Sequence, residues 1–138
     1  YKYDLIVSNP PYFENSVLAS CMARSYSRHH LSMNANDLIV GVVMQLSERG
    51  RFAVIYPFEQ WKKWLAICRH YGLYPLRVTY VYPAPGKKIK RVLAEFACTE
   101  GDTDTSELVV EEFGRHGYSA GFKALTADFY PDKNRPVR

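Results

Sequence analysis

The chain has 138 residues, of which 47% are hydrophobic and 23% are charged. That composition suffices for one ordinary globular domain with a buried core, and it excludes disordered and fibrous proteins. No apolar run approaches the roughly 18–20 residues that a membrane-spanning helix needs, and the formal net charge of +4 permits an anionic partner without requiring one.

The first predicted element is a short buried strand. Leu5–Val7 is a continuous apolar run, typical of a strand in a parallel sheet. Asn9-Pro10-Pro11 ends it, because consecutive prolines cannot continue a sheet ladder. The chain also begins with Tyr1, directly at this strand, and we therefore expect it to be a fragment of a longer protein.

Two helices and a second strand follow. Apolar residues recur at helical spacing over residues 38–46, and Gly50 stands where a C-terminal capping glycine belongs. Residues 51–56 predict the second buried strand. Pro57 suits the first turn of the next helix, which Gly72 closes.

The second helix carries Trp61 and Trp64 on one face, so we expect them in the core rather than on a base-stacking platform. Residues 76–82 and 92–98 then predict an antiparallel hairpin with a long loop. Residues 108–110 indicate a short extra strand, and residues 118–130 a final helix.

The predicted order is thus strand, helix, strand, helix, strand, strand. The first two strands, joined through a helix, should be parallel neighbours by a right-handed crossover. The last two close the sheet as an antiparallel pair. We expect an α/β fold in which residues 1–130 form part of one domain and residues 131–138 form a loose tail.

The sharpest functional signal is the segment Asn9-Pro10-Pro11-Tyr12-Phe13 after the first strand. It lies at the carboxyl end of a parallel sheet, where open α/β folds bind their ligands. The Asn9 side-chain oxygen and the Pro10 carbonyl can accept both hydrogens of an NH2 group, which leaves its lone pair directed at an electrophile. Tyr12 offers a π-face to a planar substrate, worth about 1–3 kcal/mol per stacked base. Pro11 and Phe13 flank it on the substrate side; the alternative is a simple turn.

Residues 4–12 resemble the fourth motif of class I S-adenosylmethionine-dependent methyltransferases that act on amino nitrogens. That group includes adenine-N6 methyltransferases of DNA and RNA and the release-factor glutamine methyltransferases. Four further blocks are similar to the bacterial tRNA(Val) adenine-N6 methyltransferase family: residues 28–32, 50–57, 90–95 and 118–130. The resemblance covers nearly the whole chain up to Tyr130.

The resemblance implies a Rossmann-like sheet, S-adenosylmethionine as co-substrate, tRNA as partner and methyl transfer to adenine N6. In the family's strand order, 3-2-1-4-5-7-6, the chain would supply strands 4 to 7, the C-terminal half. The glycine-rich cofactor loop of the upstream half has no counterpart, because the first glycine is Gly41, inside a predicted helix. Asn9 is then the one expected cofactor-binding residue.

Two groups of cations extend the expected substrate site. One follows the motif in a segment that can fold over a flipped base, and Arg28-His29 matches the family pattern; it comprises Arg24, Arg28 and His29. The other places four cations within five positions of the hairpin loop, as phosphate contacts or as a solvated turn; it comprises Lys87, Lys88, Lys90 and Arg91.

No metal site is expected. The three cysteines are far apart in the sequence (Cys21, Cys68 and Cys98), which argues against a disulfide framework or a zinc site and favours a reducing, cytoplasmic compartment. The neighbouring His29 and His30 have no third ligand nearby in the sequence.

Two other functions stay open. The same acceptors suit the carboxamide of a protein glutamine. Alternatively, the isolated chain is an inactive half-domain that forms a homodimer through the exposed edge of its first strand.

Overall fold

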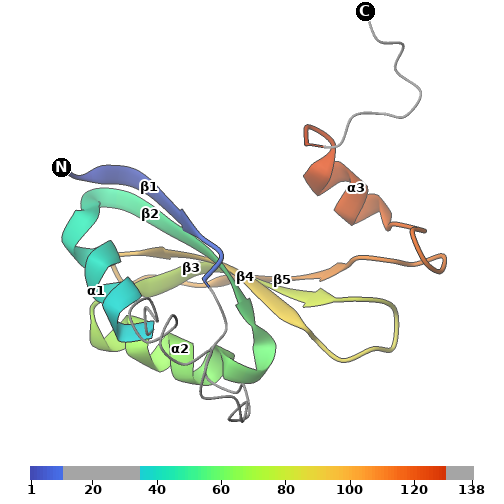
Figure 1. Ribbon diagram of the computed structural model, residues 1–138, viewed down its shortest axis with the longest axis horizontal. Coiled ribbons are helices and arrows are strands. Elements are labelled where there is room, and N and C mark those ends of the chain that lie inside the picture. The colour runs from blue at the N-terminus through green and yellow to red at the C-terminus, as the bar shows by residue number, and fades with distance from the viewer. Residues whose placement is uncertain (11–34, 130–138) are drawn as a thin grey trace, which may run out of the picture.

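The computed structural model describes residues 1–10 and 35–129 of the chain (Figure 1). Strands and helices follow one another as in an α/β protein. In chain order they are β1 (Tyr3–Ser8), α1 (Ala35–Gln45), β2 (Leu46–Pro57), α2 (Phe58–His70), β3 (Tyr74–Tyr82), β4 (Arg91–Ala97), β5 (Asp104–Val109) and α3 (Ala120–Thr126).

The strands form one mixed sheet in the order β1-β2-β4-β3-β5. β1 pairs parallel with β2, and β4 runs antiparallel to both β2 and β3. This order confirms the expected α/β fold, with strands 4-5-7-6 of the family's sheet and an antiparallel last pair. β5 lies beyond β3 and parallel to it, and it begins at Asp104, earlier than the extra strand predicted over residues 108–110.

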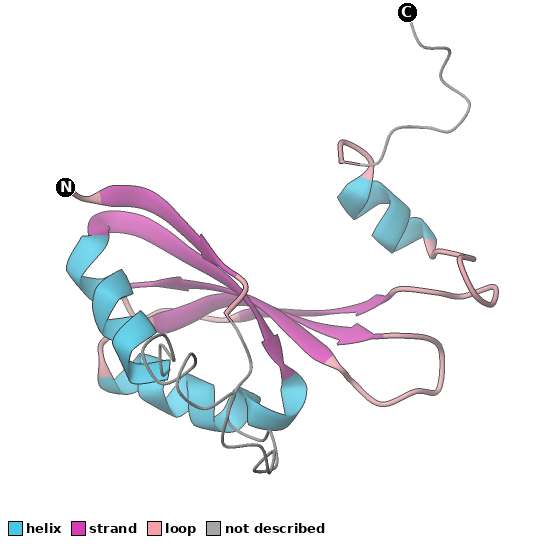
Figure 2. Ribbon diagram, in the orientation of Figure 1, coloured by secondary structure: helices cyan, strands magenta, loops and turns pink. Residues whose placement is uncertain are grey.

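Helices α1 and α2 cover the same face of the sheet (Figure 2), and the core lies between them and the strands. Alternate residues of β2, among them Phe52 and Tyr56, point into this layer because successive side chains of a strand face opposite ways. Trp64 is 1% exposed and stacks on Tyr56 with the ring centroids 4.2 Å apart. The expectation that the tryptophans of α2 belong to the core is confirmed.

The helix ends differ in part from the sequence prediction. Gly50 does not cap α1, which ends at Gln45; it lies within β2. A Cβ there would stand 2.9 Å from the carbonyl oxygen of Tyr3, so close approach of β1 explains the glycine. Pro57 is the N-cap of α2 rather than part of its first turn.

Gly72 does close α2, as predicted. Its φ is +77°, in the left-handed region that favours glycine. The Gly72 N–H donates to the Arg69 carbonyl at 3.1 Å and the Leu73 N–H to the Cys68 carbonyl at 2.9 Å. These two bonds form a Schellman motif, which satisfies carbonyls that the helix end would leave unpaired.

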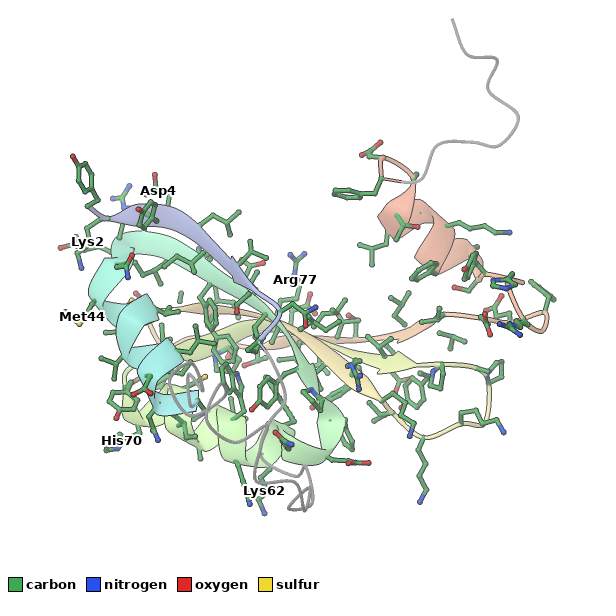
Figure 3. All side chains as sticks on the ribbon, viewed as in Figure 1. Lys2, Asp4, Met44, Lys62, His70 and Arg77 are labelled. Carbon is green, nitrogen blue, oxygen red and sulfur yellow. The ribbon has the colours of Figure 1, made fainter. Side chains whose placement is uncertain are left out.

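β1 forms the edge of the sheet in the part of the chain that the structure describes. Its outer side chains are open to solvent, with Leu5 60% and Val7 70% exposed. Polar contacts anchor its start: Lys2 Nζ donates to the Met44 carbonyl at 2.9 Å, and the Ser47 hydroxyl donates to Asp4 at 2.7 Å. Figure 3 labels Lys2 and Asp4 at the start of β1 and Met44 on α1.

No helix among the described residues is long and apolar enough to cross a membrane.

Candidate functional site

The Asn9-Pro10 pair lies at the carboxyl edge of the sheet. β1 ends at Ser8, which pairs with Val54 of the parallel strand β2, and Asn9 and Pro10 follow at once. Asn9 is exposed and Pro10 is half-buried. Because the carboxyl ends of parallel strands meet at one edge of the sheet, these two acceptors stand where open α/β folds bind ligands.

The other residues of the motif, and the cations that follow it, lie outside the described residues. Their expected roles therefore stay predictions. They are Pro11, Tyr12, Phe13, Arg24, Arg28 and His29.

An aromatic side chain stands at the same edge, where β2 passes into α2. Phe58 is the first residue of α2, is 38% exposed and meets Tyr80 edge to face, with the ring centroids 5.9 Å apart. Its N–H donates to the Lys90 carbonyl at 3.2 Å, which ties the start of α2 to the end of the hairpin loop. Its partial exposure follows from its position as the first residue of α2.

The basic hairpin loop, residues 83–90, also leaves the sheet at this edge, because β4 runs antiparallel to β2 and β3. Arg91, expected in the loop, is instead the first residue of β4. The side chains of Lys87 and Lys88 are exposed. The loop is held by bonds from the Lys87 N–H to the Ala84 carbonyl at 3.1 Å and from the Lys90 N–H to the Val81 carbonyl at 2.9 Å. Gly86 has a φ of +70°, which a turn of this shape requires.

Lys87 and Lys88 form no ion pair with any residue that the structure describes. The two ion pairs found in the described part of the chain join Glu95 to Arg51 at 3.3 Å and to Arg77 at 2.8 Å. Lys87 and Lys88 take part in neither. Since strands are spaced about 4.8 Å apart, three intervals separate β1 from β3 by about 14 Å, so Asn9 and the start of the loop lie within reach of one nucleic-acid substrate.

At the base of the loop, the Tyr82 hydroxyl donates to the Glu107 carboxylate of β5 at 2.9 Å. This hydrogen bond to Glu107 raises the pKa of Tyr82 above its ordinary value. The same bond links β3 to β5 at the base of the loop.

Comparison with known proteins gives two kinds of match, although no protein-family model matches the chain. The chain is 38% identical over 129 residues to the tRNA1(Val) (adenine(37)-N6)-methyltransferase of Parabacteroides distasonis, covering 94% of this chain and 54% of that protein. Proteins of the same name from Flavobacterium johnsoniae and Trichodesmium erythraeum are 35% and 36% identical, again over 94% of this chain and over 55% and 54% of theirs.

The chain therefore spans about half the length of the curated relatives that it matches, and the resemblance expected from its motifs is confirmed. A predicted O-methyltransferase from Agrobacterium tumefaciens has a similar structure, with a TM-score of 0.63 and 18% identity over 91% of this chain and 51% of that one. At that identity the likeness shows the fold alone.

Proposed function

We propose that the chain is the C-terminal part of a methyltransferase that modifies N6 of an adenine in tRNA. The observation that carries the proposal is the Asn9-Pro10 pair at the carboxyl edge of the sheet, in a chain similar over 94% of its length to tRNA adenine-N6 methyltransferases. A tRNA substrate would imply a cytoplasmic location, which the widely spaced cysteines support.

The motif that begins at Asn9 would orient the amino group of the target adenine. The Asn9 side-chain oxygen and the Pro10 carbonyl would accept the two amino hydrogens of adenine and leave the nitrogen lone pair free to attack. Tyr12 would stack on the ring and so fix its plane. The base must first leave its stack, at a cost of a few kcal/mol, and correct placement of the reacting atoms then supplies much of the rate.

The methyl donor would be S-adenosylmethionine, which carries an electrophilic methyl group on its sulfonium. The described residues do not form a complete site for it. A pocket of about 420 Å³ runs between β1 and α1, but its lining is largely apolar and includes Leu5, Leu38 and Val42. Its one glycine, Gly41, lies inside α1 rather than in a turn that could cradle the donor. The upstream half of a longer protein would supply that cradle.

Calorimetric titration tests whether binding of the methyl donor requires the upstream half. S-adenosylmethionine should give no heat with the chain alone and should bind the full-length protein. Tight binding by the chain alone would contradict the proposal, because the donor site would then be built from residues 1–138.

The RNA side of the site would include the basic hairpin loop. Lys87, Lys88, Lys90 and Arg91 are exposed at the edge where Asn9 stands, and cations so placed can neutralise phosphates on either side of the target base.

The second candidate substrate, a protein glutamine, presents the same NH2 group to Asn9 and Pro10. Methyl uptake into total tRNA and into protein, measured side by side with the full-length protein, separates the two. Label in tRNA alone is the expected result, and label in protein alone would overturn the RNA assignment.

The isolated chain should be inactive and should associate with itself. β1 has no partner strand on its outer side among the described residues, and its Leu5 and Val7 side chains are open to solvent. An edge strand of this kind invites pairing with another strand. Size-exclusion chromatography with light scattering should show a homodimer, whereas a clean monomer would rule out pairing through β1.

A further inference from the structure

A tight turn follows β5, and the side chain of Phe113 in this turn is exposed to solvent. The 111–118 turn is closed by an antiparallel bridge between Glu111 and Tyr118. Inside it, the N–H groups of Glu112 and Phe113 both donate to the Gly117 carbonyl, at 2.9 and 3.1 Å. The Gly117 N–H donates to the Gly114 carbonyl at 2.9 Å. The backbone of the turn is therefore fixed by its own hydrogen bonds.

The turn also holds strained backbone. Gly114 has a φ of +81°, and His116, with a φ of +67°, is the one non-glycine residue with a positive φ among the described residues. The Glu111 carboxylate accepts the His116 N–H at 2.9 Å and so supports this conformation. A Cβ on Gly117 would stand 2.6 Å from the Phe113 carbonyl oxygen. Strain of this kind persists only where the surroundings impose it, and it gathers at functional sites.

The strained turn presents Phe113, whose side chain is 79% exposed. Arg115 and His116 are exposed beside it. Tyr118 and Phe122 of this arm pack against each other, with the ring centroids 5.0 Å apart, whereas Phe129 beyond α3 is exposed like Phe113. Because the backbone that carries the Phe113 ring is already fixed by hydrogen bonds, less freedom is lost when a partner stacks on it, which favours binding.

The 111–118 turn begins beside the basic hairpin loop. The Val110 N–H donates to the Tyr82 carbonyl at 2.9 Å, and the Glu111 N–H donates to the Pro83 carbonyl at 3.0 Å. Figure 1 shows both segments leaving the same end of the sheet, the loop in yellow-green and the turn in orange. Phe113 and the exposed Lys87 and Lys88 thus lie at the same edge of the sheet as Asn9.

We propose that Phe113 is a stacking platform for an unpaired base of the RNA, with Arg115 contacting a neighbouring phosphate. The inference rests on the proposed function and adds a second contact, apart from the target adenine. Every base has a π-face, and aromatic residues next to cations are the usual elements of single-strand binding. A protein partner is less suited to this ring, because its neighbours in the turn are charged or polar, whereas the buried centre of a protein interface is depleted of charge.

The test compares two RNAs of equal length, a hairpin with an unpaired loop and a fully paired duplex, by fluorescence anisotropy with the full-length protein. Phe113→Ala should weaken hairpin binding by roughly 5- to 150-fold and leave duplex binding unchanged. Phe113→Trp should retain hairpin binding. Leu125→Ala is the matched control, because Leu125 is an exposed apolar residue of the same arm, 57% exposed on α3, and it should bind like wild type.

The results that would contradict the inference also distinguish its failure from that of the proposed function. If Phe113→Ala binds the hairpin as wild type does, or loses the duplex equally, the stacking inference is wrong while the proposed function stands. If the substitution changes the oligomeric state in light scattering instead, the turn is a protein contact and the inference is wrong. If the wild-type protein binds neither RNA, the proposed function fails and the inference fails with it.

Discussion

Neutralising two lysines of the basic hairpin loop should change how RNA binding depends on salt. The double substitution Lys87→Gln and Lys88→Gln removes two exposed cations that take part in neither ion pair of the described residues. Because no such pair is broken, the fold should keep its stability. The lost charge should therefore appear in binding alone.

The expected magnitude follows from counterion release. Each phosphate that a cation neutralises contributes a slope of about 0.7 for single strands to about 0.9 for duplexes in a plot of log K against log salt. If each lysine meets one phosphate, the double substitution should make the slope shallower by about 1.4 to 1.8. Affinity should therefore fall most at low salt and converge with wild type at high salt.

The assay is a titration of labelled tRNA with the full-length protein at several salt concentrations. Lys62→Gln with Lys63→Gln is the matched control, since these lysines are also exposed but lie on α2; Figure 3 shows Lys62 on the outer side of that helix. The control should keep the wild-type slope. An unchanged slope in the loop variant, or an equal change in both variants, would remove the loop from the RNA-binding surface.

Three other substitutions, one of them with a matched control, test the fold and the titration of Cys68. Gly72→Ala should cost about 1–2 kcal/mol in urea unfolding, because Gly72 has a φ of +77° with open space around it, whereas Gly101→Ala, also in open space but without a positive φ, should cost little. Phe96→Ala should cost about 3–5 kcal/mol, since this ring is 0% exposed; a loss under about 1 kcal/mol would contradict the assigned core. Burial raises the pKa of Cys68 from 9.0 to about 12. The folded state therefore favours the neutral thiol, and its contribution to stability is complete below pH 9.0 and is lost as the pH rises toward about 12. Cys68→Ala should flatten that alkaline fall in unfolding free energy, and an identical fall in both proteins would refute the titration.

The first four strands could be predicted from sequence because each carries apolar residues in a short run or in alternation, bounded by turn residues. The start of β5 could not, because residues 104–107 are polar. The helix between the first two strands predicted their parallel pairing, and the hairpin predicted the antiparallel pairing of β3 with β4. That β4 rather than β3 lies beside β2 was expected only from the strand order that the family resemblance implies. The role of Gly50 could not be read in this way. A capping glycine and a glycine required by close approach look alike in sequence, and the carbonyl oxygen of Tyr3, far away in the chain, decides between them.

The candidate site, like the fold, could be predicted from the sequence only in part. Asn9 and Pro10 were identifiable because the motif is local and directly follows a strand. Phe113 was not, because its significance depends on a turn that long-range bonds place beside Pro83. In the sequence, the turn was indicated only by Gly114 and Gly117, and glycines are common in any polar connecting segment.

The most direct test of the central claim is nucleoside analysis of tRNA after incubation with S-adenosylmethionine and the full-length protein, as wild type and as Asn9→Ala. We expect N6-methyladenosine with the wild-type protein and almost none with the variant, whose affinity for the methyl donor should fall far less than its turnover. Wild-type turnover by Asn9→Ala, or a methylated product other than N6-methyladenosine, would contradict the account.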